Sequence, residues 1–195
     1  MTPTFIWITA VVLYGLFWLW YVGLGRIIKQ DEIESVLAYL QSSGNPSNRL
    51  LGALRRFFEE DDGKDFVMVN LLELKEPKNE SRKKLSAYQK VFLGNLLKRA
   101  GHPVFIATVA SGKIENIGCD NDNWTDAGMV RYRSRRDLME VLPDTFGSDH
   151  HALKIEALER TFAYPATPWM IFGGPKVVVP LMLALIAALT HLAIL

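Results

Sequence analysis

The sequence is poor in cysteine and lacks the short motifs that mark several large classes of enzyme. Cys119 is its only cysteine, so an intramolecular disulfide is excluded and nothing points to an oxidising compartment. It has no phosphate-binding glycine loop, no G-x-S-x-G motif, no dinucleotide-binding glycine pattern and no metal-spaced set of Cys or His residues. These absences argue against nucleotide-driven chemistry and serine-nucleophile hydrolysis, and no metal site is predicted.

Charged side chains are missing from both ends of the chain. No Asp, Glu, Lys or Arg precedes Arg26 or follows Lys176, so all of them lie in one central block. The formal net charge is +1. Because a dedicated nucleic-acid-binding protein normally carries a basic excess, no nucleic-acid partner is expected.

Both uncharged ends are long enough to cross a bilayer as helices. At about 1.5 Å per residue, residues 5–25 reach about 31 Å and residues 177–195 about 28 Å, close to the thickness of a hydrocarbon core. The first run has no basic start and is longer than a secretory signal, so it is interpreted as a retained helix. We therefore expect transmembrane helices within residues 1–25 and 175–195, with a hairpin-like or interfacial insertion as the alternative for the second.

Basic residues beside the two runs predict the orientation of the chain. Arg26 and Lys29 follow the first run and Lys176 precedes the second. Such flanking residues favour the cytoplasmic side. The prediction is a multi-pass membrane protein with a cytoplasmic central domain, both termini outside, and membrane lipid around its helices.

Each apolar run also carries a feature that would let another membrane helix pack on it. Aromatic residues seven, four and three positions apart form a stripe down the first run: Trp7, Tyr14, Trp18 and Tyr21. In the second run, Ala184 and Ala188 form a small-xxx-small pair. These residues predict contact with a partner membrane subunit, although the preference of Trp and Tyr for membrane interfaces accounts for the aromatic residues without one.

Residues 26–62 are predicted to form a pair of helices. The stretch "DEIESVLAYLQS" has apolar residues at helical spacing, and the turn residues "SGNPS" end it. The stretch "SNRLLGALRRFFEE" then forms a strongly amphipathic helix, with Ser47 or Asn48 as its N-cap. This second helix either packs on the following domain or lies on the bilayer surface.

The pattern changes after residue 65 and predicts an α+β domain over residues 63–168. Strands are expected at residues 66–74, 103–112, 127–134 and 161–165, and helices at 86–101, 135–142 and 148–160. This order is the split βαβ plan of ferredoxin-like domains. The fold class predicted for the whole chain is therefore a ferredoxin-like α+β domain flanked by two transmembrane helices.

Three stretches, in their order and spacing, carry a family resemblance over residues 65–168. They are "FVMVNLLEL", "AGHPVFIATVASG" and "MVRYRSRRDLMEVLPDTFGSDHHALKIEALERTFAYPATP". They resemble an uncharacterised family of the dimeric α+β barrel superfamily, which includes haem-degrading and quinone-forming monooxygenases, lactone isomerases and proteins without known activity. The resemblance implies a homodimer in which two sheets form a barrel, with small ligands between sheet and helices. The membrane helices and the N-terminal helical pair depart from that family's pattern.

Three histidines are the candidates for a catalytic role. His150 and His151 follow Ser148 at the start of a predicted helix. Adjacent positions lie about 100° apart around a helix, so the pair does not match the spacing of a metal-binding motif. One of them, neutral at the helix N-terminus, would serve as a base or a haem ligand, whereas plain solvation of the helix start is the alternative. His102 lies at the mouth of the second predicted strand, where such folds often place ligand contacts.

Arg131, Tyr132 and Arg133 are the candidates for ligand binding. The alternation of the predicted strand places the two arginines on one face and Tyr132 on the other. Arginines on a central strand bind an anion or are held in ion pairs. Glu73 or a partner subunit would supply such an ion pair.

Two functions fit these features. The first is an accessory or small-ligand-binding subunit of a membrane assembly. The second is an oxygenase- or isomerase-like enzyme acting on a small hydrophobic substrate, aromatic or quinone-like, with haem among the cofactors that would suit it. The superfamily resemblance does not separate the two, because one fold supports many activities.

Overall fold

The computed structural model describes residues 2–44, 46–115, 117–118, 123–146 and 148–194. Cys119 lies outside the described residues. The chain divides into two compact units, which are described separately. The first unit comprises Met1–Leu24 and Pro168–Leu195, and the second is Gly25–Thr167.

The first unit consists mainly of two apolar helices, α1 (Pro3–Val22) and α7 (Pro175–Ala193). Both begin with proline in the first turn, where its missing N–H costs no hydrogen bond. Only 11% of the most apolar stretch of α1 and 6% of that of α7 are buried, whereas the core helix of a soluble protein would be mostly buried. Both helices are therefore long and apolar enough to cross a membrane.

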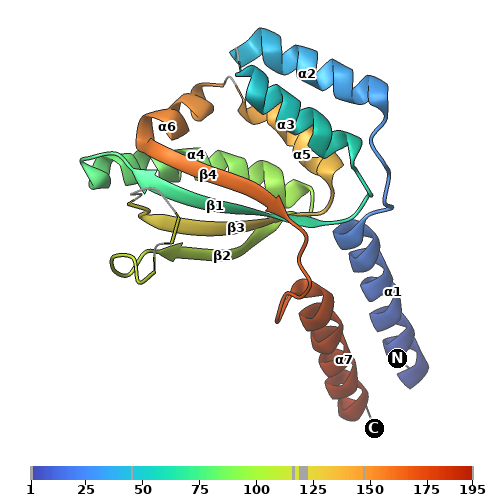
Figure 1. Cartoon of the computed structure of the whole chain (residues 1–195). Helices are drawn as coiled ribbons and strands as arrows, with labels where there is room; N and C mark the ends of the chain where they lie inside the picture. Colours follow the sequence, from blue (N-terminus) through green and yellow to red (C-terminus); the bar gives the residue numbers. More distant parts are fainter. Residues whose placement is uncertain (1, 45, 116, 119–122, 147, 195) are drawn as a thin grey trace. The chain divides into compact units, whose positions relative to one another are not determined.

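The second unit is built on one four-stranded antiparallel sheet with the strand order β2-β3-β1-β4 (Figure 1). Its strands are β1 (Phe66–Leu74), β2 (His102–Thr108), β3 (Asp126–Tyr132) and β4 (Leu158–Ala166). The central strand β1 is the continuous run of apolar and β-forming residues that the sequence predicts, and its bounds are as expected.

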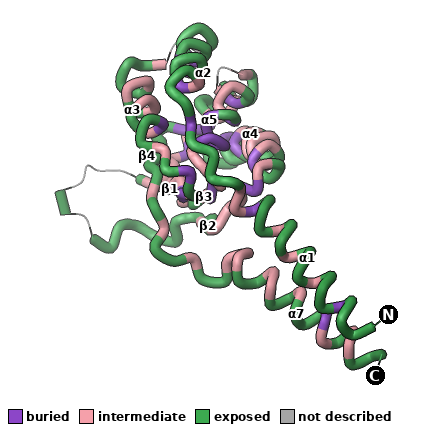
Figure 2. The backbone as a smooth tube through the Cα atoms, turned by 90° about the vertical axis from the view of Figure 1, so that its right-hand side faces the viewer, coloured by how far each residue is buried: buried purple, intermediate pink, exposed green. Residues whose placement is uncertain are grey.

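Three helices connect the strands and pack on one face of the sheet: α4 (Lys78–Lys98), α5 (Arg135–Thr145) and α6 (Asp149–Ala157). Figure 2 shows the buried residues concentrated where β1 and β3 meet α4 and α5. Alternate residues of the strands supply this core. Phe66 and Tyr132, paired across β1 and β3, stack with ring centroids 4.9 Å apart. The order of elements places the second unit in the α+β class, as predicted.

The helical pair before the sheet is present as α2 (Gln30–Gly44) and α3 (Asn48–Glu59). Ser47 is the N-cap of α3, accepting a hydrogen bond from the N–H of Leu50. The apolar stripe of α3 packs on the sheet domain, and the ring of Phe57 meets that of Phe66 at 5.1 Å. Of the two alternatives for this amphipathic helix, packing on the following domain is the one observed.

Several boundaries differ from those predicted. Helix α4 begins at Lys78, directly after Pro77, rather than at residue 86. Strand β2 ends at Thr108, before the predicted residue 112. Helix α6 ends at Ala157 because Leu158 pairs with Leu74 and is buried beside it, so β4 takes the residues expected to end the helix.

Candidate functional site

One face of the sheet is left uncovered by the helices that the structure describes in the second unit (Figure 1). Figure 1 shows α4 behind the sheet and the front face without a helix. The residues that alternate with the core positions point to this front face, and most are apolar. We call the following set the open sheet face: Val69, Leu71, Phe105, Met129, Phe162 and Tyr164. Its aromatic members are strongly exposed: Phe105 by 48%, Phe162 by 54% and Tyr164 by 44%.

Arg131 is buried at one end of this face and is held by an acid. Its Nε donates to Oδ2 of Asp65 over 2.9 Å, and Nη1 donates to the carbonyl oxygen of Ala100 over 3.0 Å. Only 1% of the residue is exposed. The acid that holds it is thus Asp65 rather than the expected Glu73, which instead faces Arg160 at 3.6 Å.

Arg133 and Tyr132 also have defined surroundings. Arg133 follows β3 and donates from Nε and Nη2 to the two carboxylate oxygens of Asp137, over 2.9 and 2.7 Å. This bidentate pair raises the pKa of Arg133. Tyr132 points to the opposite face, into the core, and burial raises the pKa of its hydroxyl. The predicted alternation is therefore observed for Arg131 and Tyr132, whereas Arg133 lies beyond the end of the strand and does not share the face of Arg131 as a strand residue.

The three candidate histidines lie on different elements. His102 begins β2, opposite Arg131 in the register, and its Nδ1 lies 3.0 Å from the carbonyl oxygen of Pro103. His150 is exposed in the first turn of α6. His151 is half-buried, and the centroid of its ring lies 5.0 Å from that of Phe146. Its backbone N–H donates to the hydroxyl oxygen of Ser148, the N-cap of α6. Burial, with a smaller effect from Lys154, lowers the pKa of His151.

These candidates do not share one cleft. His102 and Arg131 are brought together on the front of the sheet. His151 belongs to α6, which packs with α4 over the other face. Arg133 is bound to the first turn of α5. A single active site formed by all the sequence candidates is therefore not what the fold produces.

Basic and aromatic side chains meet where α6 packs on α4. His151 was a candidate from the sequence, but Lys154 and Tyr88 were not. Lys154 lies one helical turn after His151, so both are on the same side of α6. The Nζ atom of Lys154 lies 5.7 Å from the ring centroid of Tyr88, which stacks on Phe92 at 5.8 Å. Burial raises the pKa of Tyr88 to about 12 and lowers that of Lys154. Neither residue has a motif that would have identified it from sequence, because the contact joins two distant helices.

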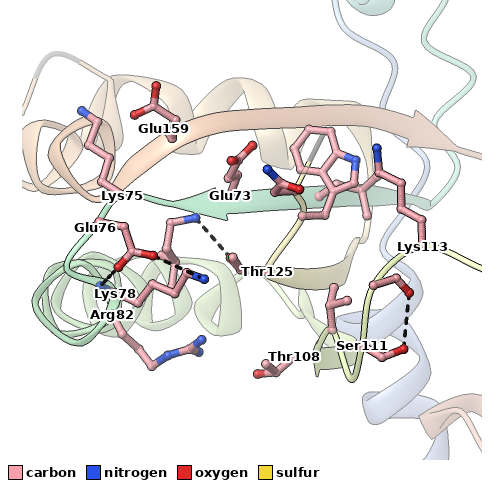
Figure 3. A pocket seen from close by; sticks show the side chains of 16 residues that line it. Glu73, Lys75, Glu76, Lys78, Arg82, Thr108, Ser111, Lys113, Thr125 and Glu159 are labelled. Carbon is pink, nitrogen blue, oxygen red and sulfur yellow. Dashed lines mark hydrogen bonds and ion pairs between the residues drawn. The ribbon is translucent and has the colours of Figure 1, made fainter. Parts of the chain in front are cut away.

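An open cavity of about 910 Å³ lies at the end of β1 that leads into α4 (Figure 3). Its lining mixes both charges, and several of them are already paired. Lys78 lies 3.4 Å from Glu76, and Arg82 binds Asp126 at 2.8 Å. Glu73 contributes a carboxylate oxygen, Oε2, that is buried without a hydrogen-bond donor among the described residues. None of the three candidate histidines lines this cavity.

The described residues contain no group of three or more His, Cys, Asp and Glu side chains able to hold a metal ion. Among the predicted site residues, Arg131 and Arg133 form ion pairs with carboxylates, and His102 contacts a backbone carbonyl oxygen. Chemically, the domain offers a charged cavity, an apolar sheet face and an amine beside aromatic rings.

In the first unit, α1 and α7 pack against each other through part of the predicted aromatic stripe. Tyr21 is buried, and the indole Nε1 of Trp7 donates to Nδ1 of His191 over 3.3 Å. Trp18 is 41% exposed. On α7, Ala187 is buried, whereas Ala184 is exposed.

Comparison with known proteins gives a fold but no family. No protein-family model and no curated protein matches the chain. The chain is similar to the crystal structure of RPA0582, a protein of unknown function from Rhodopseudomonas palustris, with a TM-score of 0.52 and 16% identity over 64% of this chain and 95% of that one. The methylated RPA0582 protein gives a TM-score of 0.52 and 17% identity over 68% of this chain and 99% of that one. At such identities, the likeness concerns the α+β fold alone.

Proposed function

We propose that the chain is a membrane-anchored accessory protein whose central unit binds a second copy, sheet to sheet, as a dimeric α+β barrel. The single observation that carries this proposal is the open sheet face. The strand order and the position of the helices on one side of the sheet suit a ferredoxin-like domain. A domain of this kind has a second sheet face that must meet water, a ligand or another layer.

A second sheet is the layer that suits this face best. Exposed aromatic and aliphatic side chains gain about 25 cal/mol for each Å² removed from water, and sheets pack face to face at about 10 Å. A twofold axis would place the same surface on both sides, so that apolar residues meet apolar residues. Glu73 and Arg160, with opposite charges at one end of the face, would border the contact without leaving like charges together.

Two membrane helices would keep the dimer at the bilayer. Arg26 and Lys29 after α1, and Lys176 at the start of α7, favour a cytoplasmic central unit with both termini outside. Trp18 and Ala184 are exposed and would be available to a partner membrane subunit. The chain would thus present a dimeric domain at the cytoplasmic surface of a membrane assembly.

Ligand binding, rather than the enzymatic alternative, fits the geometry of the charged groups. The cavity of Figure 3 has a volume in the range of small-molecule sites and a mixed charged lining that suits a polar ligand. The oxygenase- or isomerase-like alternative relied on arginines that hold an anion beside a histidine. Arg131 and Arg133 are bound by Asp65 and Asp137, and of the three histidines His102 is the one paired in register with Arg131.

The test is the mass of the full-length protein in a mild detergent, measured by native mass spectrometry. We expect a homodimer that Phe162→Lys converts largely to monomer, because a charge would then be buried against the opposing sheet. Tyr39→Lys is the control, since Tyr39 is 46% exposed on α2 and lies outside the open sheet face. A wild-type monomer, or a dimer unaffected by Phe162→Lys, would reject the proposal.

A further inference from the structure

We propose that the segment before α7 is an interfacial anchor, which inserts Trp169, Met170 and Phe172 into the boundary between the headgroups and the acyl chains of the bilayer. The partner is a lipid surface, and the contact is separate from the pairing of two sheets. This inference rests on the proposed membrane anchoring by α7, and a probe within α7 tells the failure of one from the failure of the other.

The first support is the exposure of three large apolar side chains within four residues. Trp169 is 101% exposed, Met170 is 68% exposed and Phe172 is 89% exposed. A soluble protein seldom leaves such a group in water, because removing apolar area from water is favourable. The group is therefore a surface that an apolar partner covers.

The backbone joins these side chains to α7 through a tight turn. Gly173 has a φ of +63°, a left-handed conformation that glycine adopts without strain. A Cβ built on Gly174 would lie 3.5 Å from the side chain of Ile171, so Ile171 packs back against the start of the helix. Helix α7 then begins at Pro175. The exposed side chains are thus held within a few residues of the membrane helix and belong to the same compact unit.

The second support is the distribution of aromatic residues between the two apolar helices. Helix α1 contains several Trp, Tyr and Phe residues, whereas α7 contains none. Phe172 and Trp169 are the aromatic residues closest to α7 in the sequence. Because Trp and Tyr favour the membrane–water interface, α1 carries such anchors within itself. The segment before α7 supplies the aromatic anchor that α7 lacks.

The third support is the length of α7 and the charge beside it. At about 1.5 Å per residue, its 19 residues reach about 28 Å, just under the hydrocarbon thickness of about 30 Å. The depth of such a helix depends on the interfacial residues that flank it. No acidic side chain follows Glu159 in the sequence, whereas Lys176 lies at the start of α7. This charge suits an anionic lipid surface.

The experiment measures the membrane depth of a fluorescent probe, NBD, attached to single cysteines of the full-length protein in a Cys119→Ser background. The exposed positions are Met170→Cys in the segment, Leu185→Cys in α7 and Lys90→Cys on α4. The protein is reconstituted in vesicles of phosphatidylcholine and phosphatidylglycerol that carry a nitroxide quencher near the headgroup or near the end of the acyl chain. We expect the shallow nitroxide to quench the probe at Met170→Cys most and the deep nitroxide to quench that at Leu185→Cys most. Neither should quench the probe at Lys90→Cys.

Two double variants test whether the rings hold the segment in the interface. Trp169→Ser with Phe172→Ser should reduce the shallow quenching at Met170→Cys at least twofold. Trp169→Phe with Phe172→Trp keeps both rings and should leave the quenching unchanged. Far-UV circular dichroism like that of the parent protein would show that each variant is folded.

The probe in α7 separates the ways in which the proposal fails. Deep quenching at Leu185→Cys without shallow quenching at Met170→Cys would overturn the interfacial anchor and leave the membrane helix in place. No quenching at either position would reject both. A probe at Met170→Cys that is shielded from water but not quenched by lipid would indicate a protein contact and would overturn the anchor. Shallow quenching that survives Trp169→Ser with Phe172→Ser would overturn it as well.

Discussion

Arg136 binds both carboxylate oxygens of Glu32, each over 2.7 Å, and so joins α5 to the first turn of α2. The same guanidinium donates to the carbonyl oxygen of Ile27 over 2.8 Å. One arginine therefore fixes both the segment that enters α2 and the helix itself on the sheet domain. This contact adds to the apolar packing of Ile33, Leu37 and Phe58 that joins the N-terminal helical pair to the domain.

The Arg136–Glu32 pair predicts a dependence of stability on pH. The hydrogen bond from Arg136 is the main cause that lowers the pKa of Glu32 from 4.5 to about 2. Because the pKa is lower in the folded state, this stabilisation is fully present above about pH 4.5 and is lost as the pH falls toward 2. We expect Glu32→Gln to lower the free energy of unfolding at pH 7 by about 1–2 kcal/mol, after allowance for solvent screening. Urea unfolding of the full-length protein at pH 7 and pH 3 measures this.

Glu34→Gln is the matched control for that measurement. Glu34 pairs with Arg55 between α2 and α3, but both side chains are largely exposed. Its removal should change stability little at either pH. If Glu34→Gln destabilised the protein as much as Glu32→Gln, the assigned importance of the Arg136 contact would be wrong.

Because Arg131 is buried against Asp65, we expect removal of Asp65 alone to destabilise the fold more than replacement of both residues. Asp65→Ala leaves the guanidinium of Arg131 buried without its carboxylate, which should cost about 3 kcal/mol in the free energy of unfolding. Changing both residues, as Asp65→Leu with Arg131→Met, removes the buried charge and should cost less. Thermal unfolding of the two variants compares them directly. Equal losses, or a larger loss in the double variant, would indicate that Arg131 acts mainly through other contacts.

The sequence was sufficient to predict those elements whose structure depends on the residues of one short segment. The apolar run of β1 and the cap Ser47 could be predicted from neighbouring residues. The start of β4 could not, because Leu158 leaves the helix to pair with Leu74, far away in the chain. The same holds for the site. Sequence order drew attention to the adjacent histidines, but the contact of Lys154 with Tyr88 exists only after α4 and α6 pack.

The proposed orientation of the chain predicts which cysteines a membrane-impermeant thiol reagent can reach. In a Cys119→Ser background, Ile114→Cys places a thiol at a fully exposed position of the second unit. We expect this thiol to be protected in intact cells and to react after lysis, because the proposal places the central unit in the cytoplasm. Thr2→Cys, before α1, should react in intact cells. The reverse pattern would invert the proposed topology.

Photo-crosslinking in native membranes tests the central proposal, the sheet-to-sheet homodimer, most directly. A benzophenone amino acid at Phe162 replaces an aromatic side chain of the open sheet face, and the same substitution at Tyr39 on α2 provides a control of comparable exposure. We predict a covalent homodimer after illumination for the probe at Phe162 and none for the probe at Tyr39. A probe at Phe162 that stays monomeric, or that couples only to a different protein while the chain remains a monomer, would contradict the account.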